Sequence, residues 1–209
     1  MVQAKNERRS KKPAPRQATA LRHRDLREEL IAQADAVIAT QGLSALRARD
    51  LAAEAGCSVG AIYNVFKDMD GLILEVSAAT LRAIDRVMSA VQAETPASRL
   101  LGLAQAYLDY AGSHRRRWDA LFSHRLPPEA PAVPWFDAVK DAAFSHIEGA
   151  LLQLRPELGA PACRQLGRSI FAAVHGMVSL GLDQRVAVTD LPALRAQIDL
   201  VVRAILRGL

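Results

Sequence analysis

The stretch from Arg47 to Lys67 constrains the fold more than any other part of the chain, because its pattern predicts two short helices joined by a tight turn. Apolar residues recur at helical spacing on both sides of that turn: Leu51, Ala52 and Ala55 before it, and Ile62 and Phe66 after it. Gly56 can adopt a positive φ without steric cost where the first helix ends. Ser58 is a typical N-cap for the second helix, since its hydroxyl can accept a backbone N–H of the first turn. The sequence therefore predicts a helix-turn-helix.

The outward face of the second predicted helix is unusual for a surface helix. It carries Val59, Gly60, Ala61, Tyr63, Asn64 and Lys67. These side chains are small, aromatic or basic, whereas a solvated surface helix typically carries Glu and Lys. Such a face can approach a flat polar surface closely, and the major groove of DNA is a surface of this kind. The pattern favours contact with nucleic acid.

The first 24 residues form a basic segment of different character. They contain eight Lys and Arg residues against a single Glu, while the whole chain has a formal net charge of +5. With Pro13 and Pro15 and no apolar periodicity, this segment lacks the apolar surface that independent folding requires. We expect residues 1–24 to be a disordered arm, which is either a solvated tail or a contact to phosphates or the minor groove. Its position directly before the helix-turn-helix favours the contact.

Helical periodicity continues through the rest of the chain, and no segment alternates as a strand would. Further helices are expected over residues 25–41, 69–92, 98–113, 114–122, 135–154, 161–182 and 192–206. Gly42 is expected to end the first of these helices and Asp68 to cap the next. The four prolines of residues 125–134 predict a loop. The helix at 161–182 is apolar nearly all round, so it must be covered on two faces.

These patterns predict an all-α protein of about nine helices. After the arm, a three-helix DNA-binding domain is expected at residues 25–72, followed by a second helical domain at 73–209.

Composition limits the location and the chemistry of the protein. No apolar run approaches the roughly 18 residues that span a bilayer, and the polar start is unlike a secretory signal, so we expect a cytoplasmic protein without membrane contact. Cys57 and Cys163 are too few and too isolated for a disulfide framework or a Cys-based metal site. Each is expected to be a small buried hydrophobic residue, with a redox role for Cys57 as the alternative.

The histidines do not form a metal-binding pattern. They are His23, His114, His124, His146 and His175. No two of them stand three or four apart on one helix, and no carboxylate or cysteine accompanies them at ligand spacing. We expect neither a metal nor a cofactor.

With the chain laid out in this way, it resembles the tetracycline-repressor (TetR) family of one-component transcriptional regulators. The N-terminal likeness covers residues 25–84, with a helix ending at Gly42 followed by DLAAEAGCSVGAIYNVFKDMDGL. The C-terminal likeness rests on AYLDYAGSHRRRWDALF and on FAAVHGMVSLGLDQR. The second of these segments is similar to a TetR subgroup that carries a His-Gly pair in its penultimate helix.

The resemblance implies a two-fold homodimer through the last two helices, about residues 161–183 and 192–207. It also implies a small-molecule pocket between the DNA-reading unit and that helical bundle. By position, the family's contacts to a double-stranded operator fall on Ser58, Val59, Gly60, Ala61, Tyr63, Asn64 and Lys67, with Arg49 able to reach a base edge.

Two residues depart from the family pattern. Met69 stands where a lysine commonly contacts phosphate, and Arg47 stands where a capping threonine is usual. Tyr63 and Lys67 are the expected phosphate contacts, and Arg47 and Lys67 are candidates to replace the contacts that are lost.

Aromatic residues gather in the second half of the chain and suggest a ligand pocket, although aromatic residues at helical spacing are more often plain core. An aromatic lining with few polar groups suits an apolar or aromatic effector. The candidate pocket residues are Tyr107, Trp118, Phe122, Phe144, Phe171 and His175. For His175 two interpretations stay open. Either it makes one buried hydrogen bond while Gly176 permits close helix approach, or it is a polar anchor for the ligand.

The resulting hypothesis is a ligand-responsive transcriptional regulator, most simply a repressor that a small apolar effector releases from its operator. The alternative is a sequence-independent DNA-coating protein driven by the basic arm. Residues 56–60 also match G-x-S-x-G, the nucleophile elbow of esterases, but that motif requires a preceding strand, and here helices flank it. We therefore expect no enzyme activity.

Overall fold

The computed structural model describes residues 15–183 and 190–209, and every regular element within them is helical. The α-helices are α1 (Pro15–Gln41), α2 (Ala48–Glu54), α3 (Val59–Phe66), α4 (Met69–Ser89), α5 (Pro96–Ser113), α6 (Arg115–Ser123), α7 (Pro134–Leu154), α8 (Gly159–Asp183) and α9 (Leu191–Arg207). Two short 3₁₀ helices, η1 (Leu43–Ala45) and η2 (Pro156–Leu158), join neighbouring helices. The prediction of an all-α fold is confirmed.

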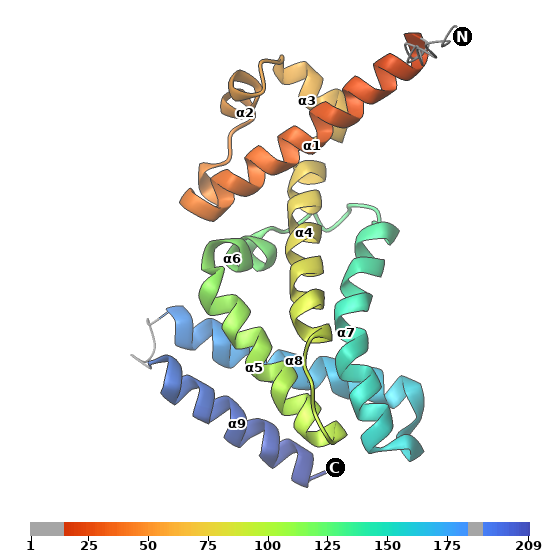
Figure 1. Cartoon of the computed structure of the whole chain (residues 1–209), viewed down its shortest axis with the longest axis vertical. Coiled ribbons are helices and arrows are strands. Elements are labelled where there is room, and N and C mark those ends of the chain that lie inside the picture. The colour runs from red at the N-terminus through yellow and green to blue at the C-terminus, as the bar shows by residue number, and fades with distance from the viewer. Residues whose placement is uncertain (1–14, 184–189) are drawn as a thin grey trace, which may run out of the picture.

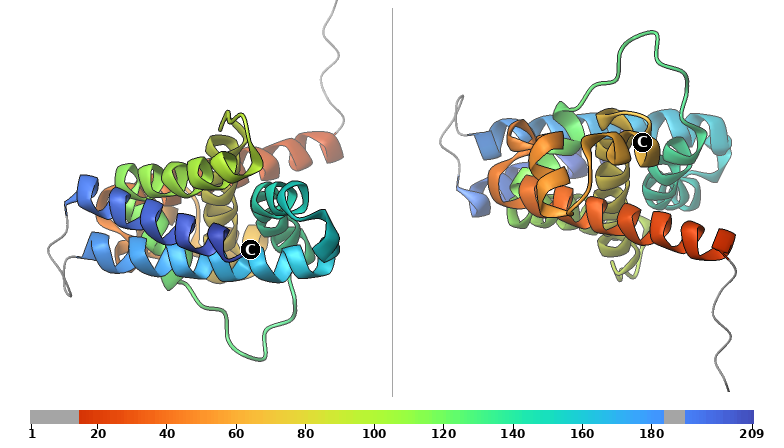
Figure 2. Two further views of the ribbon diagram at one scale, coloured as in Figure 1. Left: turned by 90° about the horizontal axis from the view of Figure 1, so that it is seen from below. Right: turned by 90° about the horizontal axis from the view of Figure 1, so that it is seen from above.

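The helices are arranged along one long axis (Figure 1). Helices α1 to α3 form one end, and α4 runs from them into a second group made of α5, α7, α8 and α9. Helix α6 lies between the two groups and packs on both α1 and α4. Helices α8 and α9 lie side by side on one flank of the second group, while the 124–133 loop projects from the body (Figure 2).

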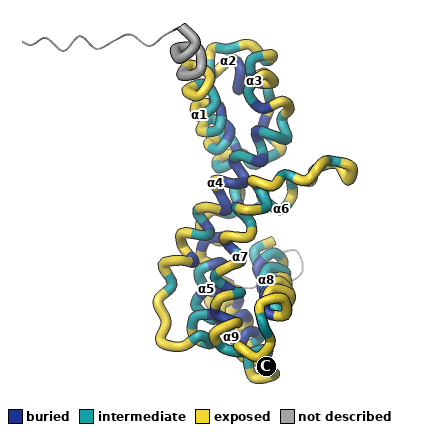
Figure 3. Tube along the Cα trace, turned by 90° about the vertical axis from the view of Figure 1, so that its right-hand side faces the viewer, coloured by how far each residue is buried: buried dark blue, intermediate teal, exposed yellow. Residues whose placement is uncertain are grey.

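Two hydrophobic cores follow from this arrangement, and α4 contributes to both. The core at the α1 end contains Leu72 and Val76 from the start of α4, whereas the second core contains Ile84 and Met88 from its far half. Buried positions accordingly continue along the whole length of α4 (Figure 3). Ala120 of α6 belongs to the first core, although its neighbour Trp118 belongs to the second. Helices α4 and α6 therefore connect the two groups through buried side chains.

Helix α1 begins earlier than expected. It starts at Pro15 rather than Asp25, so residues 15–24, which the sequence assigned to a disordered arm, are helical. Two properties explain the difference: a proline in the first turn costs no intrahelical hydrogen bond, and residues 16–24 are mostly Ala, Leu, Arg and Gln, which are good helix formers. Residues 1–14 of the predicted arm lie outside the described residues.

Two other helices begin two residues earlier than expected, again at or near prolines. Helix α5 begins at Pro96, because Thr95 caps it and exchanges reciprocal hydrogen bonds with Ser98. Helix α8 begins at Gly159, two residues before Pro161. In both cases proline was taken as a helix break or first residue, but it is tolerated anywhere in the first turn.

Within the described chain α8 is covered on one face, not on two. Its buried residues are Cys163, Gly167, Ile170, Val174 and Val178, and they face the helices beside it. The opposite face exposes Ala172, Ala173 and Leu180. Nothing lies within 4 Å of the position that a Cβ on Gly176 would occupy, so the expectation that this glycine permits close helix approach is not met inside the protomer. Gly181 does this instead, since a Cβ there would lie 2.7 Å from Leu194 of α9.

Candidate DNA-binding surface and ligand cavity

The turn between α2 and α3 has the local structure that its sequence predicts. Gly56 adopts a φ of 62°, in the left-handed region that favours glycine. The Ser58 hydroxyl accepts a hydrogen bond from the backbone N–H of Ala61 at 3.2 Å, so Ser58 is the N-cap of α3. Asp68 caps α4 in the same way, accepting from the N–H of Gly71 at 2.7 Å. The two caps therefore fix the first residues of α3 and α4.

The inner face of α3 holds the helix against the rest of the unit. Ile62 is fully buried and Phe66 nearly so, and both belong to the core that α1, α2 and the start of α4 share. Leu30 and Ile38 supply the α1 side of that core. The Arg27 guanidinium lies 5.7 Å from the Phe66 ring centre and pairs with Glu75 of α4. Helix α3 is therefore fixed by packing on α1 and α4.

The outer face of α3 is accessible along its length. Tyr63 is 44% exposed, and Asn64, Gly60 and Lys67 are also exposed. The two smaller candidates, Val59 and Ala61, are half-buried, and Ser58 combines its capping role with an exposed position. All seven candidates on or beside this helix thus lie at or near one surface, which is low in relief because most of them are small.

Lys67 has a backbone conformation that the sequence did not indicate. Its φ is 71°, which makes it the one non-glycine residue with a positive φ in the described part of the chain. Its N–H donates to the Tyr63 carbonyl at 2.9 Å, which ends α3 and turns the chain toward Asp68. A positive φ is strained for a residue with a Cβ, and the flanking capped helices hold it there.

The two arginines before α3 differ in their surroundings. Arg49 is exposed in the first turn of α2. Arg47 is the N-cap of α2 without a side-chain cap, and its guanidinium Nη1 donates to the carbonyls of Ser44 and Leu46. Met69, which stands where the family commonly has lysine, is half-buried and packs against the first core. Its side chain serves packing rather than phosphate contact.

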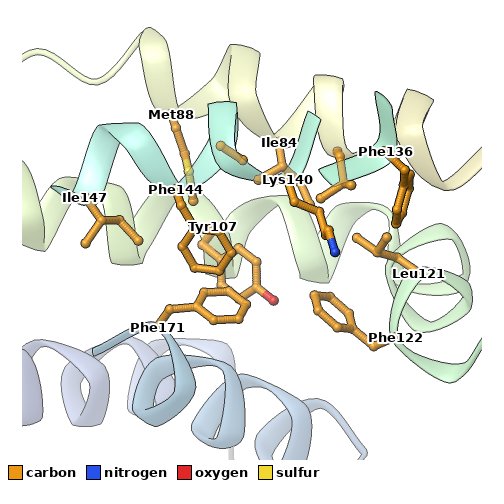
Figure 4. Close-up of a pocket in the computed structure, with 12 residues that line it drawn as sticks. Ile84, Met88, Tyr107, Leu121, Phe122, Phe136, Lys140, Phe144, Ile147 and Phe171 are labelled. Carbon is orange, nitrogen blue, oxygen red and sulfur yellow. The ribbon is translucent and has the colours of Figure 1, made fainter. Parts of the chain in front are cut away.

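A cavity of about 200 Å³ lies between α4, α5, α6, α7 and α8 (Figure 4). Its lining consists of Leu81, Ile84, Met88, Tyr107, Leu121, Phe122, Phe136, Lys140, Ala143, Phe144, Ile147 and Phe171. Four of the six candidates proposed from the sequence therefore line it. The other two, Trp118 and His175, lie behind Tyr107 and Phe122 and do not line the cavity. Sequence reasoning missed Leu121, the α4 residues and every α7 residue except Phe144, and Lys140 is the most distinctive of those missed.

A chain of hydrogen bonds joins Trp118, Tyr107 and His175 at the cavity wall. The Trp118 indole N–H donates to the Tyr107 hydroxyl oxygen at 2.9 Å. That hydroxyl lies 2.8 Å from Nδ1 of His175 and can donate to it when the ring is neutral. Burial lowers the pKa of His175, which favours the neutral ring, and burial raises the pKa of Tyr107 well above its usual value. The buried-hydrogen-bond interpretation of His175 matches this geometry.

Helix α6 connects the cavity to the DNA-binding end. Leu121 and Phe122 line the cavity, while Arg117 on the same helix forms a two-pronged ion pair with Asp35 of α1, each N–O distance being 2.7 Å. The hydrogen bond that Arg117 donates to the Asp35 carboxylate raises the pKa of Arg117 further. Helix α6 therefore contacts both the cavity and α1.

The described residues offer little support for a metal site or an esterase site. They contain no group of three or more His, Cys, Asp or Glu side chains that could hold a metal ion. Cys163 is buried as expected, whereas Cys57 is half-buried rather than buried. Ser58, the serine of the G-x-S-x-G match, begins a helix after a helical turn, so the strand that an esterase motif needs is absent at this position. Among the described helices, none is both long and apolar enough to cross a bilayer.

Two family models match the chain. The model for bacterial regulatory proteins of the tetR family matches residues 30–76, and the model for a tetracyclin repressor-like C-terminal domain matches residues 100–205. No curated protein matches the sequence.

Several solved structures share the fold. A protein with unknown function from Rhodococcus sp. RHA1 superimposes with a TM-score of 0.69 at 20% identity, covering 88% of this chain and 94% of that one. The TetR family transcriptional regulator PfmR from Thermus thermophilus gives 0.57 at 19% identity, covering 86% and 98%. A transcriptional regulator from Rhodococcus sp. Rha1 gives 0.60 at 21% identity, covering 87% and 96%.

Proposed function

The chain belongs to the TetR family of bacterial regulatory proteins, and from that premise we propose that it is a homodimeric repressor released from its operator by a small apolar effector. Members of the family are DNA-binding transcriptional regulators rather than enzymes. The observation that carries the proposal is the continuity of α4, which begins beside the recognition helix α3 and ends in the wall of an apolar cavity.

The operator contacts are assigned to the exposed surface around α3. Asn64 and Gly60 would approach base edges in the major groove, and Tyr63 and Lys67 would contact phosphates. Arg49 is the candidate for a specific contact, because an arginine that pairs with a guanine edge is worth about 1–3 kcal/mol of discrimination. The Arg47 guanidinium already donates to two backbone carbonyls, so it would attract phosphate through its charge rather than recognise a particular base.

The dimer is assigned to α8 and α9. Their exposed faces carry Leu180 and Leu200, which are 54% and 64% exposed in the protomer. Ala172 and the unobstructed Gly176 lie on the same side of α8, and small residues permit close helix packing. A two-fold pair of these helices would bury the leucines and place two α3 helices about 34 Å apart, as successive major grooves require.

Release of DNA would follow from the position of the cavity. Leu81, Ile84 and Met88 of α4 and Phe122 of α6 line it, so a ligand that fits only one arrangement of these helices favours that arrangement. The Arg117 to Asp35 ion pair and the shared cores would carry the change to α1 and α3. This is a coupling free energy between two sites, and by reciprocity the operator would weaken effector binding.

The test begins with the operator, selected from genomic fragments by the purified protein. Affinity for that sequence should exceed affinity for random DNA by about 10³ or more at physiological salt, whereas a ratio near unity would support DNA coating by the basic arm.

The domain boundary at residues 72 and 73 remains a prediction. Because α4 contributes to both cores, we place the junction of the two domains within this helix.

Two substitutions separate base reading from phosphate contact. Arg49→Ala should relax preference at one base pair in each half-site, while Lys67→Ala should weaken binding about equally on all sequences. Arg82→Ala, which removes an exposed arginine from the middle of α4, is the matched control and should leave operator binding unchanged. If Arg49→Ala weakens every sequence alike, Arg49 is a phosphate contact.

The dimer is tested separately by sedimentation equilibrium. Leu200→Glu places a charge on the exposed face of α9 and should convert the dimer to monomer with loss of operator binding. A dimer that survives this substitution would place the interface elsewhere.

A further inference from the structure

The apolar cavity adjoins a second space beneath the 124–133 loop. This outer space has a volume of about 420 Å³ and shares Leu121, Phe136 and Lys140 with the apolar cavity. Its own lining is more polar and includes His124 and Asp137. The two spaces therefore meet at Lys140, with apolar groups on one side and a mixed surface on the other. A site with this division suits a ligand with an apolar body and a polar head.

Lys140 is the polar group that remains available to a ligand in the apolar cavity. Two of the twelve lining side chains carry polar atoms, Tyr107 and Lys140. The Tyr107 hydroxyl is already engaged by Trp118 and His175. Figure 4 shows the Lys140 amine extending between Phe136, Leu121 and Phe122 toward the centre of the site. An ammonium group has three donors and no acceptor, so it selects an acceptor, and most strongly an anion.

The present partner of Lys140 is replaceable. Its amine lies 2.6 Å from the Asp137 carboxylate, and their side chains are 43% and 48% exposed. An ion pair this exposed contributes little to stability, since both charges are well solvated when apart. The outer space also holds His124, whose buried Nε2 has no hydrogen-bond partner and lies 3.5 Å from Asp70. At the junction of the two spaces, the donor that a carboxylate would meet is therefore the Lys140 amine.

We infer that the effector is a small carboxylic acid with an aryl or compact aliphatic body, whose carboxylate displaces Asp137 from Lys140. The inference rests on the proposed ligand-responsive function and names the ligand class. A cavity of about 150 Å³ holds benzene, so about 200 Å³ accommodates a body of roughly eight carbon atoms. The aromatic rings of Phe122, Phe144 and Phe171 favour an aryl body.

The experiment titrates three proteins with two matched probes by calorimetry at neutral pH. The probes are 3-phenylpropanoate and its neutral counterpart 3-phenylpropan-1-ol. The wild type should bind the acid about tenfold more tightly than the alcohol, as one hydrogen bond to a charged group provides. Lys140→Met should remove this tenfold advantage, so that acid and alcohol bind about equally. Asp137→Asn should tighten acid binding relative to alcohol binding, because it removes a competing carboxylate.

The outcomes separate this inference from the proposed function. Retained alcohol binding in Lys140→Met shows that the variant is folded, and Lys140→Arg should restore the preference for the acid. If acid and alcohol bind equally and both release the operator, the acid inference is overturned while the ligand-responsive function stands. If neither probe binds to a protein that still binds its operator, the inference and the assignment of this cavity both fail. Equal effects of Lys140→Met and Asp137→Asn on acid affinity would also overturn the inference.

Discussion

Removing the Tyr107 hydroxyl gives the sharpest test of how the cavity wall is held. Tyr107 and Trp118 are each 2% exposed, and the indole N–H donates to this hydroxyl at 2.9 Å. Tyr107→Phe keeps the ring, so the edge contacts to Trp118 and Phe171 remain. The indole N–H would lose its partner in a dry environment, at a cost of about 1–3 kcal/mol. His175 would lose a partner at Nδ1 but is only half-buried, so the total expected loss is about 2–4 kcal/mol.

The assay is urea unfolding followed by far-ultraviolet circular dichroism, at one protein concentration because dimerisation contributes to apparent stability. The matched control is Tyr63→Phe, the same chemical change at a tyrosine that is 44% exposed. The control should change the free energy of unfolding by less than about 0.5 kcal/mol. The reasoning is refuted if Tyr107→Phe loses no more stability than Tyr63→Phe.

Three further predictions concern caps, glycines and pH. Ser58→Ala removes the cap of α3 and should cost about 1 kcal/mol in the free energy of urea unfolding. Gly71→Ala should destabilise the protein by more than Ser58→Ala does, because the new Cβ would lie 2.3 Å from the carbonyl oxygen of Phe66. Gly149→Ala, at an open position in a helix, should instead stabilise it by about 0.5–1 kcal/mol. Equal effects of the two glycine substitutions would contradict the clash at Gly71. Burial lowers the pKa of His175 below 6.5, so the unfolded chain binds more protons there and wild-type stability should fall as pH drops below 6.5. His175→Gln should reduce that fall, and identical pH profiles of unfolding for the two proteins would contradict it.

Short-range features were predictable from the residues themselves. The caps at Ser58 and Asp68 and the positive φ of Gly56 depend on a few neighbouring atoms, and the structure has all three. Helical periodicity likewise identified the buried face of α3, because burial follows from the spacing of apolar side chains along one helix, but it gave α8 a second covered face that the protomer leaves exposed. The start of α1 was not predicted, since the basic charge of residues 15–24 obscured their high helix propensity.

Features that depend on neighbours distant in sequence were not predictable. Aromatic composition identified Tyr107, Phe122, Phe144 and Phe171, which line the cavity, but it could not separate them from Trp118, which packs behind them. A cavity is the space that several helices leave unfilled, so its boundary depends on their crossing geometry. Lys140 was overlooked because a lysine on an amphipathic helix normally faces solvent, whereas this one lines the cavity. The positive φ of Lys67 has no sequence signal, since a glycine would be expected there.

The length of α4 determines how far its end beside α3 moves when the helix tilts. Its 21 residues make a rod of about 31 Å, and Gly71 in its first turn lies close to the Phe66 carbonyl at the end of the recognition helix. A tilt of about 10° about the cavity end would then carry the other end sideways by roughly 5 Å, from the length of the rod alone. That displacement exceeds the axial rise of one base pair, about 3.4 Å. Under the proposed mechanism, a ligand that tilts α4 by this angle would therefore move the recognition helix by more than one base-pair step along the groove.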